Sequence, residues 1–246
     1  MEVLETELDV VQTERERIAI LVWMASMWEE EFLKPERAAQ RLEQVVDIAS
    51  HHVGALNGLE RLYRAMKKWG QLIDTYERHV QATPDRGEKI RCYKAIGEVH
   101  QKELDDVDRA IDSYLNVLSV EEHDQEALDV LSRLYTKRGD HSSALDMMGQ
   151  LIRLVGDPAR QVDLAYRMGQ VLDNELGDRG GALEQYRKAT DLEPAHLPSL
   201  EAMRKIQLDS GEWLAAAKTL EQEARFSENP RVKAQRLVEL GRLYDN

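Results

Sequence analysis

The sequence predicts an all-α protein, an α-solenoid of stacked pairs of antiparallel helices. Two observations carry this prediction. Small, aromatic and aliphatic residues recur at a constant step of 72 residues along the 246-residue chain. The apolar residues between them follow the period of an amphipathic helix. Such self-similarity is typical of repeat architectures, in which each helix pair completes its core against its neighbours.

The repeat is visible without any gap. A column of small residues keeps the step of 72 residues: Ala25, Gly97, Gly169 and Gly241. A column of large residues keeps the same step: Leu42, Tyr114 and Tyr186. Each 72-residue unit divides into two similar halves, so the chain is expected to hold about six repeats in three double units.

Each half reads as two amphipathic helices joined by a turn. Within 90–102, the apolar residues Tyr93, Ile96 and Val99 recur at helical spacing, and 110–118 repeats this pattern. A proline at the start of a helix loses no hydrogen bond. All the prolines fall between predicted helices or in a first turn: Pro35, Pro84, Pro158, Pro194, Pro198 and Pro230.

The two columns also predict how the helices pack. A glycine at 97 or 169 removes the side chain that would hold a facing helix away. The tyrosines at 114 and 186 are large enough to fill the space between helices. We therefore expect glycine and tyrosine to meet at the helix interfaces.

The pattern resembles the tetratricopeptide repeat family. Residues 127–151, ALDVLSRLYTKRGDHSSALDMMGQL, carry the L…Y…G-D…A…L series of that family closely. The segment 18–32 departs most, with Ala25 in the glycine column and Trp28 in the tyrosine column. The resemblance covers essentially the whole chain and implies a right-handed superhelix. It says little about function, because function depends on the site rather than on the fold.

This resemblance predicts a single array over 1–246. Its parts are the tail of a preceding repeat (1–12), three double units (13–84, 85–156 and 157–230) and the first helix of a further repeat (231–246). Leu237 and Leu240 keep the packing pattern of a helix that expects a partner. We therefore expect the chain to be a fragment of a longer array.

Composition argues against several function classes. With 33 basic and 46 acidic residues the formal charge is −13, which argues against general nucleic-acid binding through phosphate contacts. No apolar run approaches the ~20 residues of a membrane span. Residues 1–11 lack the basic start and apolar core of a secretory signal. The cytoplasm is thus the expected compartment.

No motif indicates catalysis. GDRGG at 177–181 reads as a helix-to-helix turn, and the acidic segment 103–108 lacks the spaced ligands of a calcium loop. The histidines are scattered, and Cys92 is expected to be a half-buried structural thiol. We therefore expect a protein that is not an enzyme and has no cofactor and no metal.

The most informative surface is the concave one, which the resemblance assigns to the first helix of each repeat. From the second to the fifth repeat, its off-column positions hold eight basic and five acidic residues. This excess predicts a peptide groove that attracts an acidic segment. The candidate groove residues are Asn57, Arg61, Arg64, Arg91, Lys94, Lys102, Arg133, Lys137, Arg167, Gln170 and Asn174. The alternative is that these are ordinary solvated faces whose charges pair with one another.

Two functions fit this sequence. The first is a non-catalytic scaffold that holds a protein or peptide partner, acidic by the charge argument, in its groove. The second is a structural spacer that self-associates through exposed end helices.

Overall fold

The computed structural model describes residues 2–244, and within this range all regular secondary structure is helical. This confirms the all-α solenoid predicted from the repeat. The fourteen helices of the described range are α1 (Glu2–Val10), α2 (Glu14–Glu30), α3 (Pro35–Ile48), α4 (Val53–Ala65), α5 (Trp69–Ala82), α6 (Arg86–Lys102), α7 (Val107–Val120), α8 (Gln125–Arg138), α9 (His141–Leu154), α10 (Pro158–Asn174), α11 (Arg179–Leu192), α12 (Leu197–Asp209), α13 (Trp213–Phe226) and α14 (Pro230–Tyr244).

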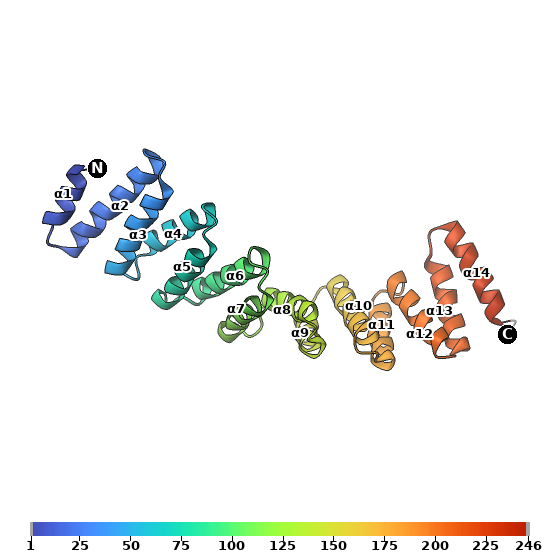
Figure 1. Ribbon diagram of the computed structural model, residues 1–246. Coiled ribbons are helices and arrows are strands. Elements are labelled where there is room, and N and C mark those ends of the chain that lie inside the picture. The colour runs from blue at the N-terminus through green and yellow to red at the C-terminus, as the bar shows by residue number, and fades with distance from the viewer. Residues whose placement is uncertain (1, 245–246) are drawn as a thin grey trace. The chain divides into compact units, whose positions relative to one another are not determined.

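The helices form antiparallel pairs joined by short turns (Figure 1). Extensive contacts join helices that follow one another in the chain, for example α2 with α3, α6 with α7 and α10 with α11. The chain divides into two compact units, unit 1 (residues 1–127) and unit 2 (residues 128–246).

The helix starts follow from capping chemistry. Asp85, Asp106 and Asp178 each stand before a helix, and each side chain accepts a hydrogen bond from a backbone N–H three residues on. Pro35 and Pro158 occupy the first positions of α3 and α10. The predicted positions of the prolines, between helices or in a first turn, are confirmed.

The contact between glycine and tyrosine is confirmed in both units. A Cβ added at Gly97 would lie 2.6 Å from the ring of Tyr114, well inside any normal contact. The ring of Tyr186 covers Gly169 in the same way. Only a residue without a side chain fits beneath these rings, so the column of small residues sets the distance between α6 and α7 and between α10 and α11.

Each turn inside these helix pairs contains one residue whose backbone has a positive φ angle. The backbone is left-handed at two sets of positions that each keep the 72-residue step: Leu33, Asp105 and Gly177, and Lys67, Gly139 and Gly211. These positions explain why glycine recurs in some of the turns, because glycine adopts positive φ without steric cost.

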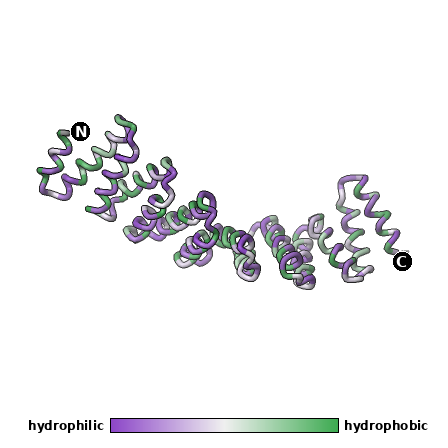
Figure 2. The backbone as a smooth tube through the Cα atoms, viewed as in Figure 1, coloured by the Kyte–Doolittle hydropathy of each residue, from purple (hydrophilic) through white to green (hydrophobic). Residues whose placement is uncertain are grey.

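Each unit has an apolar core that runs along its helices. In unit 1, buried leucines and tyrosines such as Leu21, Leu59 and Tyr76 form a cluster that extends from α2 to α6. In unit 2, Tyr186 and Ile206 belong to a smaller cluster between α11 and α12. Figure 2 shows hydrophobic and hydrophilic positions alternating along the helices, as amphipathic packing requires. Within the described range, no helix has the length and apolar character needed to span a bilayer.

Candidate functional site

The eleven candidate groove residues all lie on α4, α6, α8 and α10, the first helices of four successive pairs. Asn57, Arg61 and Arg64 belong to α4, and Arg91, Lys94 and Lys102 to α6. Arg133 and Lys137 belong to α8, and Arg167, Gln170 and Asn174 to α10.

In unit 1 the predicted cations form ion pairs between neighbouring first helices. Arg61 binds both carboxylate oxygens of Glu29 on α2, with one N···O distance of 2.7 Å. Arg91 binds Glu60 on α4 at 3.0 and 3.1 Å. These pairs cross-link α2 to α4 and α4 to α6.

Lys94 continues this arrangement toward the start of α8. Its Nζ lies 2.9 Å from Asp124 and 2.6 Å from Glu126. Burial lowers the pKa of Lys94, but the hydrogen bonds to the two carboxylates outweigh it and raise the pKa overall. Lys94 is therefore positively charged and held between two acids.

The carboxylates in these pairs offset the positive charge expected on the first helices. Glu29, Glu60 and Asp124 do not belong to the five acidic residues counted on the predicted face, yet they contact its basic residues directly. On α6, Lys102 also binds Glu98 of the same helix at 3.0 Å. The pairing matches the alternative interpretation, in which charged faces neutralise themselves.

The remaining unit 1 candidates are not brought together. Arg64 donates a hydrogen bond to the Tyr76 hydroxyl at 2.8 Å, and Asn57 is exposed on α4. In unit 2, Lys137 is exposed on α8.

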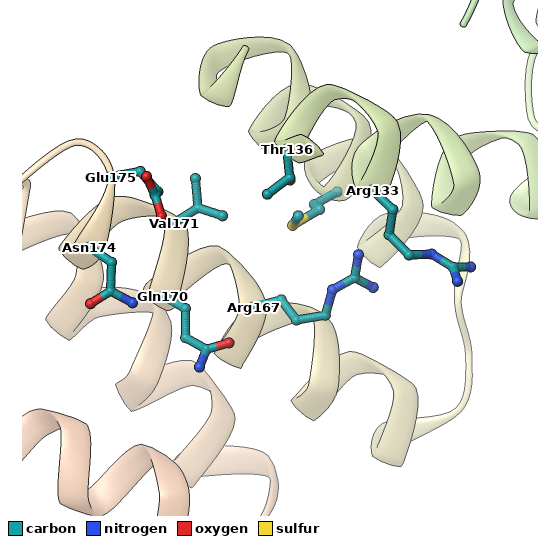
Figure 3. Close-up of a pocket in the computed structure, with 8 residues that line it drawn as sticks. Arg133, Thr136, Arg167, Gln170, Val171, Asn174 and Glu175 are labelled. Carbon is teal, nitrogen blue, oxygen red and sulfur yellow. The ribbon is translucent and has the colours of Figure 1, made fainter. Parts of the chain in front are cut away.

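Four candidates of unit 2 do share one site. Arg133, Arg167, Gln170 and Asn174 line an open hollow of about 350 Å³, here called the α8–α10 hollow. Its other lining residues are Thr136, Met148, Val171 and Glu175. Figure 3 shows Gln170 and Asn174 following one another along α10, with the guanidinium groups of Arg167 and Arg133 at the same end of the hollow.

One carboxylate joins the two arginines of this hollow. Arg167 Nη1 lies 3.0 Å from Asp129 Oδ1, and Arg133 binds Asp129 Oδ2. Arg167 also donates to the Ser132 hydroxyl at 3.0 Å. A second acid, Asp163, lies 3.7 Å from Arg167 and is 64% exposed. The pair of guanidinium groups thus has one closely bound carboxylate and one looser one.

A second cluster lies in the core of unit 1 and was missed by the sequence analysis. Glu60 on α4, His79 on α5 and Cys92 on α6 are all buried, and one ligand atom from each lies within 4.8 Å of the other two. His79 Nδ1 lies 2.7 Å from Glu60 Oε1. The expectation of a half-buried thiol at Cys92 was wrong, because its exposure is 0%. The burial raises the pKa of Cys92 to about 12.

The repeat itself contains the signal for this cluster. Positions 60, 79 and 92 lie on three successive helices, and we call such a set of positions a junction. Two further junctions lie at steps of 72 residues along the chain. The middle junction holds Ser132, Leu151 and Leu164, and the last holds Arg204, Glu223 and Arg236. All three residues of the middle junction are buried. Comparing the copies would have singled out Glu60, His79 and Cys92 as polar or titratable residues at core positions.

The last junction is a buried ion cluster. Arg204 Nε lies 2.7 Å from Glu223 Oε1, and Arg236 Nε lies 2.8 Å from Glu223 Oε2. The Glu223 side chain is only 2% exposed. Its burial raises the pKa of Glu223 above the ordinary glutamate value, although both arginines act in the opposite direction.

Comparisons with known proteins agree with this architecture. The sequence model of the tetratricopeptide repeat matches residues 55–90 and 127–162, each of which covers a helix pair and the start of the next. Among the curated proteins, none matches the chain.

Several solved structures are similar in outline. One is MamA, with 19% identity and a TM-score of 0.49, covering 68% of this chain and 95% of MamA. Another is YrrB, titled a TPR protein with an unusual peptide-binding site, with 20% identity and a TM-score of 0.47, covering 78% of this chain and 97% of YrrB. Yeast Tom70 has 12% identity and a TM-score of 0.47, covering 92% of this chain and 47% of Tom70. The chain thus contains at least two segments that match the tetratricopeptide repeat, and both lie within its array of helix pairs.

Proposed function

We propose that this chain is a non-catalytic scaffold that binds an extended segment of a partner protein in the α8–α10 hollow. The observation that carries the proposal is the convergence of Arg133, Arg167, Gln170 and Asn174 on one open hollow. Helical-repeat proteins bind partners along surfaces built from successive repeats. YrrB, described as a TPR protein with an unusual peptide-binding site, is one of the solved structures similar to this chain.

The chemistry of the hollow suits a peptide. Gln170 and Asn174 each carry an amide that both donates and accepts hydrogen bonds, as a peptide backbone requires. Thr136 adds a hydroxyl, and Met148 and Val171 add apolar surface. The preferred segment is acidic, because a ligand carboxylate can replace Asp163, the looser of the two acids near Arg167.

The test is binding of a labelled glutamate-rich peptide, followed by fluorescence anisotropy at low and high salt. We expect the peptide to bind more tightly than the same peptide with glutamine at every glutamate, and to weaken with salt. Arg133→Glu should abolish the difference between the two peptides. Arg153→Glu, which changes an exposed arginine of α9 outside the hollow, is the matched control and should preserve it. Equal binding of both peptides without salt dependence would eliminate the acidic preference.

The second candidate function is a spacer that self-associates, and one observation favours it. On α14, Leu237, Val238 and Tyr244 are 51%, 56% and 59% exposed. Contiguous exposed apolar residues are typical of surfaces that bind another protein. Light scattering against concentration tests this function, and Leu237→Lys with Val238→Lys should lower the measured mass if the chain self-associates through α14.

A further inference from the structure

We propose that Glu60, His79 and Cys92 form a binding site for Zn²⁺ or a similar borderline-soft divalent cation inside unit 1. The site is separate from the α8–α10 hollow and does not depend on the proposed function. Its three ligand atoms lie within 4.8 Å of one another and come from three helices, α4, α5 and α6.

The donor set fits zinc. Zinc in proteins is bound by cysteine sulfur, histidine nitrogen and carboxylate oxygen at about 2.0–2.3 Å, with four ligands in tetrahedral arrangement. A thiolate beside an imidazole selects against magnesium and calcium, which prefer oxygen. Two donors of one tetrahedral zinc lie more than about 3 Å apart. The widest separations in the cluster, up to 4.8 Å, therefore shorten on binding, and the 2.7 Å hydrogen bond between His79 and Glu60 opens. The fourth position falls to water. Glu88 Oε2 lies 3.9 Å from His79 Nε2, the ring nitrogen that points away from Glu60, and so stays a neighbour of the site.

The surroundings keep the donors in place. Cys92 is fully buried, His79 is 2% exposed and Glu60 is 8% exposed. Arg91 lies over the cluster and binds Glu60 at 3.0 Å and Glu88 at 2.9 Å. Arg91 and Glu88 are partly exposed, at 40% and 45%, so this pair is the side of the site nearest to solvent.

The charges balance when the ion is bound. Coordination releases the Cys92 thiol proton to solvent and leaves His79 neutral. The two positive charges of Zn²⁺ and the one of Arg91 then face three negative charges, on Cys92, Glu60 and Glu88. Arg91 therefore compensates the third negative charge. Its guanidinium contacts both oxygens of Glu60 and lies 3.3 Å from His79 Nδ1, so it must move aside, toward Glu88, when the ion binds.

The repeat shows that the fold does not require polar residues at this junction. The equivalent middle junction is filled by Ser132, Leu151 and Leu164, which shows that this position in the fold accepts apolar side chains. Burying a carboxylate and an imidazole there costs free energy that leucine does not incur. A bound metal offsets that cost, because the free energy of metal binding adds to the free energy of folding.

The experiment is a titration of the metal-free protein with Co²⁺, read by absorption, followed by displacement with Zn²⁺. We expect a thiolate-to-cobalt charge-transfer band that disappears when Zn²⁺ is added, and a higher melting temperature with Zn²⁺ present. Cys92→Ser should lose the band. His79→Leu, which copies the residue at 151, should weaken Zn²⁺ binding by at least ~10-fold.

The matched control is His100→Leu, which changes a second buried histidine, on α6, that lies outside the cluster. It should keep both the band and the Zn²⁺ response. Circular dichroism without metal establishes that each variant is folded. If Cys92→Ser does not fold, His79→Leu alone tests the site. Absence of the band in the unmodified protein, or its persistence in both cluster variants, would overturn the proposal.

Discussion

In unit 1, the left-handed residue of every helix-pair turn carries a side chain, whereas in unit 2 the equivalent residues are glycines. Leu33, Lys67 and Asp105 belong to the first group, and Gly139, Gly177 and Gly211 to the second. A side chain in this conformation costs about 1–2 kcal/mol, except that aspartate tolerates it better. The same fold is thus built with more local strain in unit 1, and the packing of the flanking helices must offset it.

The junctions of the two units also differ in the polarity of their residues. Unit 1 places a carboxylate, an imidazole and a thiol at Glu60, His79 and Cys92, while unit 2 holds one largely apolar junction and one ion cluster. Identical backbone positions therefore accept three kinds of chemistry. The comparison teaches that the repeat fixes the geometry of these positions and leaves their polarity open to specialisation.

The largest expected effect is the loss of stability when the ion cluster of unit 2 is broken. Arg204→Leu leaves the buried Glu223 with one arginine, and we expect it to lower the free energy of unfolding by about 3 kcal/mol. Replacing the whole cluster by its apolar equivalent, with Arg204→Ser, Glu223→Leu and Arg236→Leu, should leave stability equal or higher.

Urea denaturation followed by circular dichroism measures both variants. Lys218→Leu, on the exposed side of α13, is the control and should change stability by less than about 0.5 kcal/mol. If the triple variant is as unstable as Arg204→Leu, the ion cluster has a structural role that leucine cannot fill.

The second prediction concerns a feature that the two units share. Gly97→Ala pushes a methyl group into the Tyr114 ring, and we expect a loss of about 2 kcal/mol. Adding Tyr114→Leu reproduces the Ala25 and Leu42 pair found one double unit earlier and should recover most of the loss. Thermal denaturation of the single and double variants measures this coupling, and additive losses would contradict it.

The third prediction narrows the difference between the turns. Lys67→Gly gives unit 1 the residue found at 139 and 211, and we expect a gain of about 0.5 kcal/mol, the relief of strain less the entropy of glycine. The reverse change, Gly139→Ala, should destabilise unit 2. Urea midpoints compare the two, and a loss on Lys67→Gly would show that the lysine side chain stabilises the turn.

The smallest expected effect is a dependence of stability on pH, caused by a histidine of unit 1 whose equivalent in unit 2 is a leucine. His100 is buried on α6, and burial lowers its pKa below 6.5, whereas the equivalent position in unit 2 is Leu172. Below its unfolded pKa the unfolded chain binds a proton that the folded chain does not, so stability falls as the pH falls through this range. His100→Leu should reduce the drop in melting temperature between about pH 7 and pH 5. An unchanged drop would assign the acid sensitivity to other groups.

The sequence was sufficient to predict the helix pairs, the glycine and tyrosine contacts and the helices that carry the candidate residues, because each depends on spacing alone. It was not sufficient for the charge of the predicted groove. Glu29 and Glu60 neutralise Arg61 and Arg91 from a helix 31 or 32 residues away, and this pairing depends on side-chain direction within a single turn of helix. The cluster at Glu60, His79 and Cys92 has no sequence motif because its members come from three helices, although comparing the three junctions reveals it.

The contacts between successive helices have a consequence for local unfolding. Because α2 packs on α3, α6 on α7 and α10 on α11, little of the structure depends on residues distant in the chain. Loops closed between such neighbours are short, and the energy of a repeat array is approximately a sum over adjacent repeats. One helix pair can therefore open locally while pairs elsewhere in the chain stay folded.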